Sequence, residues 1–277
     1  MQNSNSRKRF FECETANGQA IRFRVNRRKK TASIIRIALT PETGSVVIPG
    51  TMYADDIPYT VTAIGNRAFW GCHSLTSVTV PAGVTTIRYD AFKSSKRLTS
   101  IHVDGKNPKY SSEAGVLFDK NKTTFRYPQG KTGSYTLPDS VTTIGNWAFF
   151  DCKSLTSVTI PNSVAVIGIY AFSRCHGFIS VIIPAGVTVI DHVAFGDCES
   201  LTSITIPDSA TVIGGYAFSS CENLAEIHNR RATPQKITAV FEGVNKQTCT
   251  LYVPESAVAV YKSAPVWKSF ANIVREI

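Results

Sequence analysis

The chain has 277 residues, of which 43% are hydrophobic and 18% are charged, and its formal net charge is +10. This composition excludes a disordered protein, and the length suits one elongated domain or two compact ones. No run approaches the roughly 18 apolar residues of a membrane-spanning helix, and the N-terminus lacks the apolar core of a signal peptide.

Positive charge is concentrated in the first thirty residues, where nine Lys or Arg against two Glu give +7 of the net +10. Clustered cations bind polyanions such as nucleic acid or acidic glycans by releasing counterions. The residues that would make such a site are Arg22, Arg24, Arg27, Arg28, Lys29 and Lys30. The alternative is a solvated, partly disordered terminus. We expect residues 1–60 to combine this segment with β-hairpins that cap the fold.

A repeat of 23 residues follows. The dipeptide Ala-Phe ends at Phe69, Phe92, Phe149, Phe172, Phe195 and Phe218, with spacings of 23, 57, 23, 23 and 23 residues. A fixed period of this length with Leu, Val and Ile at set positions is typical of a leucine-rich-repeat solenoid. One coil cannot bury its apolar side alone, so stacked coils must share a core. The sequence therefore predicts an α/β leucine-rich-repeat solenoid, dominated by β-structure, over residues 61–229.

Each coil contains a similar strand segment. The segment "LTSVTVP" at 75–81 alternates apolar and polar residues, and Pro81 ends the strand because it has no N–H to donate. The recurrence of this segment predicts one long parallel sheet. The I-G-x-x-A-F segment is too short for a full helix and predicts turns or 3-10 segments on the other side. The repeated Phe residues should stack as a spine, since adjacent strands lie about 4.8 Å apart.

Two regions depart from the period. Residues 104–134 are expected to form a hairpin excursion, "GVLFDKNKTTFRYP", after which 135–137 supply a substitute strand. Phe118 or Phe125 could then fill the gap in the Phe spine. Residues 230–277 are expected to form a C-terminal cap of a strand and a short helix. Its core would contain Ala257, Val258, Tyr261, Trp267, Phe270 and Ile273.

The cysteines do not indicate a metal site or disulfides. One repeat position holds Cys72, Cys152, Cys175, Cys198 and Cys221. Zinc sites need pairs two to four residues apart, and neighbouring strands hold side chains further apart than a relaxed disulfide prefers. We expect buried free thiols between coils. No histidine or carboxylate pattern of catalysis occurs, so we expect neither an enzyme nor a cofactor.

Two surfaces of the solenoid could bind a partner. The outward strand positions are mostly Ser and Thr, and the exceptions that could give specificity are His102, Ile182, His228 and Tyr252. The turns carry large aromatics beside the Ala-Phe pair, which are Trp147, Phe150, Tyr170 and Tyr216. Aromatic residues of this kind often anchor interfaces. Alternatively, the strand positions reflect only β-propensity and solubility, and the turn aromatics only cover the spine.

The repeat I-G-x-x-A-F-x-x-C-x-x-L-x-S-V-x-I-P, the excursion and the ending "LYVP…Y…W…F…I" resemble the BspA-like leucine-rich-repeat family over about residues 44–277. Its members are mostly bacterial secreted or surface proteins. The resemblance implies adhesion or binding of a protein or glycan, without catalytic residues. It also implies an extracellular or cell-surface location with the signal peptide removed; the alternative is the cytoplasm. Polyanion binding by the basic segment remains the alternative function. The sequence specifies neither the partner nor the oligomeric state.

Overall fold

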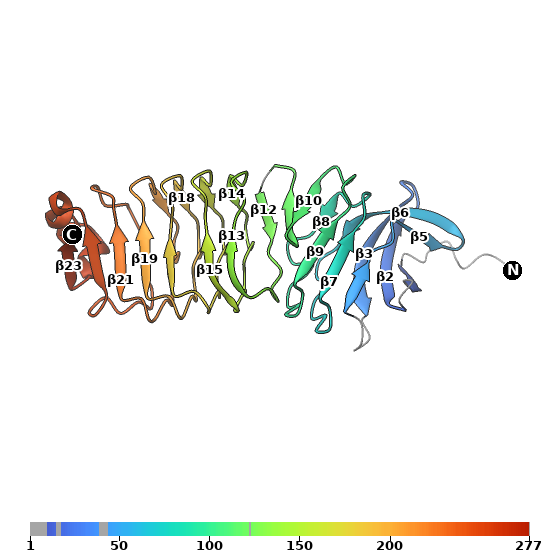
Figure 1. The fold of residues 1–277 in the computed structure, drawn as a ribbon, viewed down its shortest axis with the longest axis horizontal. Coiled ribbons are helices and arrows are strands. Elements are labelled where there is room, and N and C mark those ends of the chain that lie inside the picture. Colours follow the sequence, from blue (N-terminus) through green and yellow to red (C-terminus); the bar gives the residue numbers. More distant parts are fainter. Residues whose placement is uncertain (1–9, 15–17, 39–43, 122, 277) are drawn as a thin grey trace. The chain divides into compact units, whose positions relative to one another are not determined.

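A computed structural model describes residues 10–14, 18–38, 44–121 and 123–276. The chain divides into two compact units (Figure 1). Unit 1 comprises Met1–Lys120 with Pro128–Gly130, and unit 2 comprises Asn121–Tyr127 with Lys131–Ile277. The solenoid fold is confirmed in both, since coils about 23 residues long stack through parallel strands.

Unit 1 opens with the expected β-cap. Its antiparallel strands are β1 (Phe10–Glu14), β2 (Ala20–Asn26) and β3 (Thr31–Ala38). A hairpin of β5 (Thr51–Ala54) and β6 (Ile57–Ile64) follows, and β6 pairs parallel with β3. Residues 20–30 are therefore folded strand and turn rather than a disordered terminus. Arg7, Lys8 and Arg9 lie outside the described residues.

The first coils of unit 1 follow the cap. Their parallel strands are β4 (Ser45–Val47), β7 (Ser77–Val80) and β9 (Ser100–Val103). The excursion then contains an antiparallel hairpin of β10 (Tyr110–Glu113) and β11 (Val116–Asp119). The strand expected downstream of the polar turn is also present, at Thr123–Arg126.

In unit 2 the strand face is a series of parallel strands with a 23-residue register. The strands are β13 (Gly133–Thr136), β15 (Leu155–Thr159), β17 (Ser180–Ile182), β19 (Ser203–Ile206), β21 (Glu226–Asn229), β22 (Thr250–Val253) and β23 (Asn272–Arg275). The strand ladder is interrupted between β15 and β17. The third coil carries Gly177 and Phe178 where its neighbours carry a polar residue and Leu. The face is therefore two ladders in this unit rather than one long sheet.

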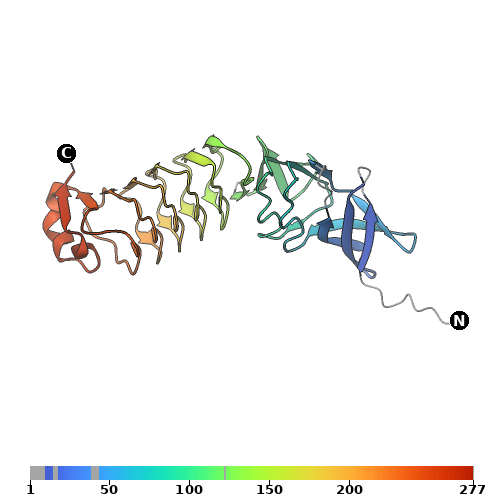
Figure 2. The same ribbon diagram turned by 90° about the horizontal axis from the view of Figure 1, so that it is seen from below.

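A second parallel ladder lies along the other side of the coils, which the sequence did not predict. In unit 2 its strands are β12 (Thr123–Arg126), β14 (Thr143–Ile144), β16 (Val166–Ile167), β18 (Val189–Ile190) and β20 (Val212–Ile213). In β14, β16, β18 and β20 the Ile is buried, and each of these strands pairs with the one in the neighbouring coil. The same arrangement appears in unit 1, where β8 (Thr86–Ile87) pairs with β6. Figure 2 shows these short strands repeating from coil to coil.

Turns connect the second ladder to the strand face, as expected. In these turns of unit 2 the Phe amide donates to a carbonyl oxygen of the next coil, for example Phe172 to Ala194 at 2.7 Å and Phe218 to Val240 at 3.0 Å. The Phe rings stack in file beneath these turns. Phe149, Phe172 and Phe195 follow one another at centroid distances of 4.8 and 5.1 Å, and Phe218 and Phe241 continue the stack. The ring before Phe149 is Tyr127, at 4.9 Å, rather than Phe118. The side chain of Phe125 lies outside the described ones.

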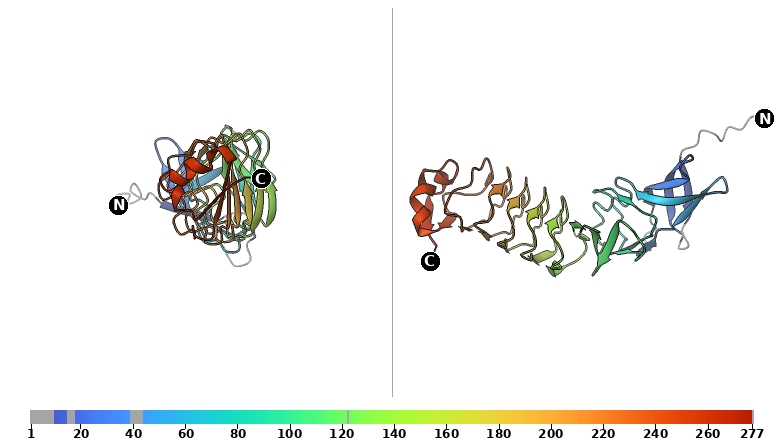
Figure 3. Two further views of the ribbon diagram at one scale, coloured as in Figure 1. Left: turned by 90° about the vertical axis from the view of Figure 1, so that its left-hand side faces the viewer. Right: turned by 90° about the horizontal axis from the view of Figure 1, so that it is seen from above.

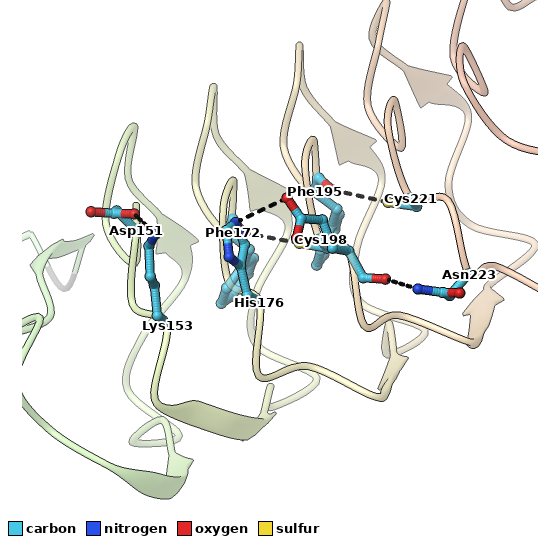
Figure 4. Close-up of polar contacts among 9 residues, drawn as sticks. Asp151, Lys153, Phe172, His176, Phe195, Cys198, Cys221 and Asn223 are labelled. Carbon is cyan, nitrogen blue, oxygen red and sulfur yellow. Dashed lines mark hydrogen bonds and ion pairs between the residues drawn. The ribbon is translucent and has the colours of Figure 1, made fainter.

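The repeated cysteines are free and buried, as expected. Each thiol of the later coils donates to a Phe carbonyl oxygen of the preceding coil: Cys198 to Phe172 at 3.2 Å and Cys221 to Phe195 at 3.3 Å (Figure 4). Ser95 takes the same position in unit 1 and donates to Phe69 at 2.6 Å. Burial raises the pKa of Cys221 to about 12 and holds the pKa of Cys198 well above its ordinary value.

The C-terminal cap covers the last coil with β22, α1 (Val258–Ser263) and β23, which is drawn in red in Figure 3. Trp267 is completely buried and its Nε1–H donates to the carbonyl oxygen of Gln235 at 2.9 Å. Tyr261 is also buried and its hydroxyl donates to the Arg231 carbonyl oxygen. The strand and helix were expected; β23, which extends the parallel ladder beyond β22, was not. Val258 is only half-buried, unlike the other expected core residues.

Candidate binding surfaces

The outward positions of the strand face are exposed or half-buried, and its four distinctive side chains do not form one site. His102 lies on β9 in unit 1. Ile182 on β17 is 73% exposed, and Ile179 beside that strand is 61% exposed. The remaining two, His228 and Tyr252, lie on neighbouring strands at the C-terminal end of unit 2.

His228 and Tyr252 are engaged with each other and with the cap. Their rings stack at a centroid distance of 4.6 Å. The two ring nitrogens of His228 lie 3.5 Å from carboxylate oxygens of Glu226 and Glu276. Because the imidazole is held between two carboxylates and a ring, this pair serves the packing of the C-terminal strands more directly than it offers a free surface.

The turn aromatics of unit 2 do come together. Trp147 and Tyr170, one coil apart, stack at a centroid distance of 4.2 Å, and Phe150 meets Trp147 edge-on at 4.8 Å. Next in line is His192, whose ring lies 6.1 Å from that of Tyr170 and 5.7 Å from that of Tyr216. We call these five residues the aromatic row.

The sequence did not indicate His192. Val193 occupies the repeat position of Trp147, Tyr170 and Tyr216, so that position leaves a gap in the row at its coil. The imidazole of the preceding residue fills the gap and contacts the rings on both sides. The available signal was the large side chain at 192 where the last coil has Gly215. The row is partly accessible: His192 and Tyr216 are exposed, and Trp147, Phe150 and Tyr170 are half-buried.

The backbone directs these side chains away from the core. Trp147, Tyr170 and Tyr216 have φ values of 62°, 54° and 60°, in the left-handed region that favours Gly and Asn. Each such residue costs about 1–2 kcal/mol relative to a right-handed conformation. Arg67, Val193 and Ala239 share this backbone position with φ near 50°, so the left-handed turn also occurs where the side chain is not a ring. Bulky rings at a position suited to Gly therefore lower the stability of the folded chain, and packing alone does not require them there.

The basic segment forms a hairpin of β2 and β3 whose cations are partly engaged within unit 1. Arg27 pairs with Asp55 at 3.1 Å. Arg22 lies over the ring of Phe10 at 5.3 Å, and Lys30 over that of Tyr59 at 5.5 Å. Among the described residues, the three that are exposed and have neither a recorded ion pair nor a recorded ring contact are Arg24, Arg28 and Lys29.

Two properties of the described residues concern metal ions and membranes. They contain no group of three or more His, Cys, Asp or Glu arranged to hold a metal ion. Among their helices, none has both the length and the apolar content needed to cross a bilayer.

Comparison with known proteins places the repeat in a defined group. The family model of the BspA type leucine rich repeat region matches residues 54–115 and 120–247, in six copies. Among curated proteins no sequence matches the chain.

Solved bacterial structures share the fold. A leucine-rich repeat protein of Bacteroides ovatus is 20% identical, with 92% of this chain and 75% of that chain covered and a TM-score of 0.54. The pneumococcal vaccine antigen PcpA is 14% identical, with 96% and 99% covered and a TM-score of 0.53. A leucine-rich repeat protein of Eubacterium ventriosum is 24% identical, with a TM-score of 0.50. The match covers 76% of this chain but only 48% of that one, so this chain spans about half its length.

Proposed function

The chain belongs to the BspA-type leucine-rich-repeat family, and from that premise we propose that it is a non-enzymatic binding module that contacts a protein partner through the aromatic row. The observation that carries the proposal is the row itself. Four successive coils place aromatic rings in contact along one edge, and three of these rings sit on left-handed backbone. Strain of this kind is retained where function requires it.

The geometry of the rings favours a protein partner over a glycan. A sugar that binds an aromatic platform needs an open ring face. Trp147 and Tyr170 cover one face of each other at an interplanar angle of 17°, and His192 lies edge-on between Tyr170 and Tyr216. These contacts leave fewer open ring faces than an unstacked platform would offer. Amphipathic, rigid rings are the typical anchors of protein interfaces.

Polyanion binding by the basic hairpin has less support, because Arg22, Arg27 and Lys30 already have partners within unit 1. We place the protein outside the cell or on its surface. The support is the family, together with the pneumococcal vaccine antigen whose fold this chain shares. Protease treatment of intact cells that express the protein tests this location. An extracellular location predicts that the protein is cleaved without lysis of the cells.

The binding test replaces the three rings on left-handed backbone by Asn, as Trp147→Asn/Tyr170→Asn/Tyr216→Asn. Asn tolerates that backbone, so the variant removes the rings without adding strain. Affinities for a panel of purified extracellular-matrix and cell-surface proteins are measured by biolayer interferometry. We expect at least one protein to bind the wild type and to lose about tenfold or more in affinity with the variant, as for anchor residues of interfaces.

Val193→Asn is the matched control, since it changes the same backbone position in the intervening coil and removes no ring. It should bind as the wild type does. Equal affinity of the triple variant and the wild type for every panel protein would remove the aromatic row from the function.

A further inference from the structure

Unit 1 contains a cavity of about 590 Å³ that none of the surfaces above includes. Arg36, near the end of β3, forms one wall. Trp70 and His73 come from the turn of the first coil, and Arg97 comes from the turn that precedes β9. The volume lies within the range of small-molecule sites, about 300–1,000 Å³.

The two arginines of the cavity are uncompensated. Among the described residues neither Arg36 nor Arg97 takes part in an ion pair, and both are exposed. Arg36 also lies directly opposite Arg22 in the β2–β3 pairing, so two like charges share one face of the sheet. Such a pair is unfavourable. Glu12 lies on the other side of Arg22, in the β1–β2 register, and forms no recorded ion pair with it. An anion in the cavity would relieve this repulsion.

The cavity is a built feature rather than two flexible side chains on a surface. The Gly130 amide donates to the Leu98 carbonyl oxygen at 2.8 Å, and a Cβ on Gly130 would lie 2.6 Å from the carbonyl carbon of Arg97. The backbone that carries Arg97 is therefore packed tightly. Arg36 also acts on the Cys72 thiol in the cavity wall: burial raises the pKa of this thiol to about 11, and the guanidinium opposes that rise.

Trp70 differs from the rings of the aromatic row. It follows Phe69 as Phe150 follows Phe149, yet it has no recorded ring contact among the described residues and is 48% exposed. Trp70 is therefore not stacked on another ring and lines the cavity, whereas Trp147 is stacked on Tyr170. An open aromatic face packs well against the C–H face of a sugar ring, because the face carries partial negative charge.

We propose that this cavity binds an acidic sugar residue of a glycan, with its carboxylate or sulfate on Arg36 and Arg97 and its ring against Trp70. The planar guanidinium fork suits both oxyanions, and His73 at the rim can donate one more hydrogen bond. A single-stranded nucleic acid is a poorer fit, since it needs a groove that follows several phosphates. This site is in unit 1 and is independent of the protein-binding row.

The experiment measures binding of three disaccharides by isothermal titration calorimetry and by Trp fluorescence. The probes are an unsulfated uronic-acid disaccharide, a sulfated heparin-derived disaccharide and neutral lactose; AMP provides the nucleotide arm. We expect one or both acidic disaccharides to bind, lactose not to bind, and affinity to fall as NaCl rises from about 50 to about 200 mM. The two acidic probes show which oxyanion the site prefers.

Arg36→Gln/Arg97→Gln should lose about tenfold or more in affinity for the acidic probe, because both charge-assisted contacts are removed. Arg24→Gln/Arg28→Gln is the matched control: it removes the same charge from the neighbouring hairpin and should leave affinity unchanged. Trp70→Leu changes a half-exposed ring and should weaken binding in a chain that keeps its fold.

The proposal is overturned if no acidic disaccharide binds at millimolar concentration, or if Arg36→Gln/Arg97→Gln binds as the wild type does. It is also overturned if AMP binds these residues more tightly than the sugars. Loss of binding in the control pair as well as in the cavity pair would assign the effect to general charge, which contradicts the site. None of these results depends on the aromatic row in unit 2.

Discussion

Residue identity sets two features of every coil in unit 2, the outward ring and the buried thiol. The 23-residue spacing predicted both positions, because a repeated coil repeats its environment. It did not predict the backbone at the ring position. Left-handed residues are usually inferred from Gly or Asn, and this column instead contains Trp147, Tyr170, Val193 and Tyr216. The place of His192 in the aromatic row could not be predicted for the same reason. It depends on the direction in which the turn points each side chain.

Val193 is the least suited of these residues to a left-handed backbone, because its side chain is β-branched and its φ is 53°. We expect Val193→Asn to raise the free energy of unfolding by about 1 kcal/mol, as the strain is relieved. Chemical denaturation followed by circular dichroism measures the change. Thr159→Asn, at an exposed position of extended strand β15, is the comparison and should lower stability slightly. A destabilised Val193→Asn would show that the position carries no strain.

The buried thiols should make the protein sensitive to alkali. Burial raises the pKa of Cys221 to about 12 and the pKa of Cys249 to about 11, from an ordinary value of 9.0. Below about pH 9 both states keep these protons and the contribution to stability is complete. Above that pH the unfolded chain loses them first, so stability falls by about 1.4 kcal/mol per pH unit for each thiol until the folded pKa is reached.

A thiol-to-hydroxyl variant separates this effect from other alkaline titrations. Cys175→Ser/Cys198→Ser/Cys221→Ser keeps a donor to the same carbonyl oxygens, as Ser95 does in unit 1. Denaturation midpoints between pH 8 and pH 10.5 should fall less steeply for this variant than for the wild type. Parallel slopes would mean that the thiols do not titrate differently in the folded and unfolded chains.

At the scale of elements, the 23-residue period and the Pro residues that end strands predicted the strand face, and departures from the period predicted the excursion and the helical cap. The second ladder was missed because its strands, such as β16 and β18, contain two residues each. Two residues are too few to show the alternation that indicates a strand. β23 was missed because "NIVR" follows a helix and closes the core, so its burial was expected but not its pairing with β22. Both omissions concern backbone pairing that the apolar pattern does not encode.

The C-terminal cap depends on Trp267, which closes the stack of rings against Phe241 at 5.5 Å. Trp267→Ala should cost about 3–5 kcal/mol in unfolding free energy through the cavity it creates. Trp267→Phe keeps most of the apolar volume but leaves the buried Gln235 carbonyl oxygen without its donor, and should cost about 1–3 kcal/mol. Thermal and urea denaturation measure both. A Trp267→Phe variant as stable as the wild type would show that the hydrogen bond contributes nothing beyond packing.

At the scale of the whole molecule, charge and candidate sites are distributed unequally between the two units. Unit 1 carries the basic hairpin and the cationic cavity, whereas unit 2 carries the aromatic row. The sequence located the basic segment but left open whether it binds a polyanion or is a solvated, partly disordered terminus. In the structure, β2 contributes the buried side chains Ile21 and Phe23 to the cap. Removing the first thirty residues would therefore damage the fold of unit 1, and charge must be tested by substitution.

The central claim is that stacked coils bring the aromatic row together as the surface that a protein partner covers. Hydroxyl-radical footprinting of the chain, alone and saturated with the panel protein that it binds, tests this most directly. The account predicts that Trp147, Tyr170 and Tyr216 lose reactivity on binding while Trp70 in unit 1 keeps its own. Unchanged reactivity along the row, with protection falling on the strand face or on unit 1, would contradict it.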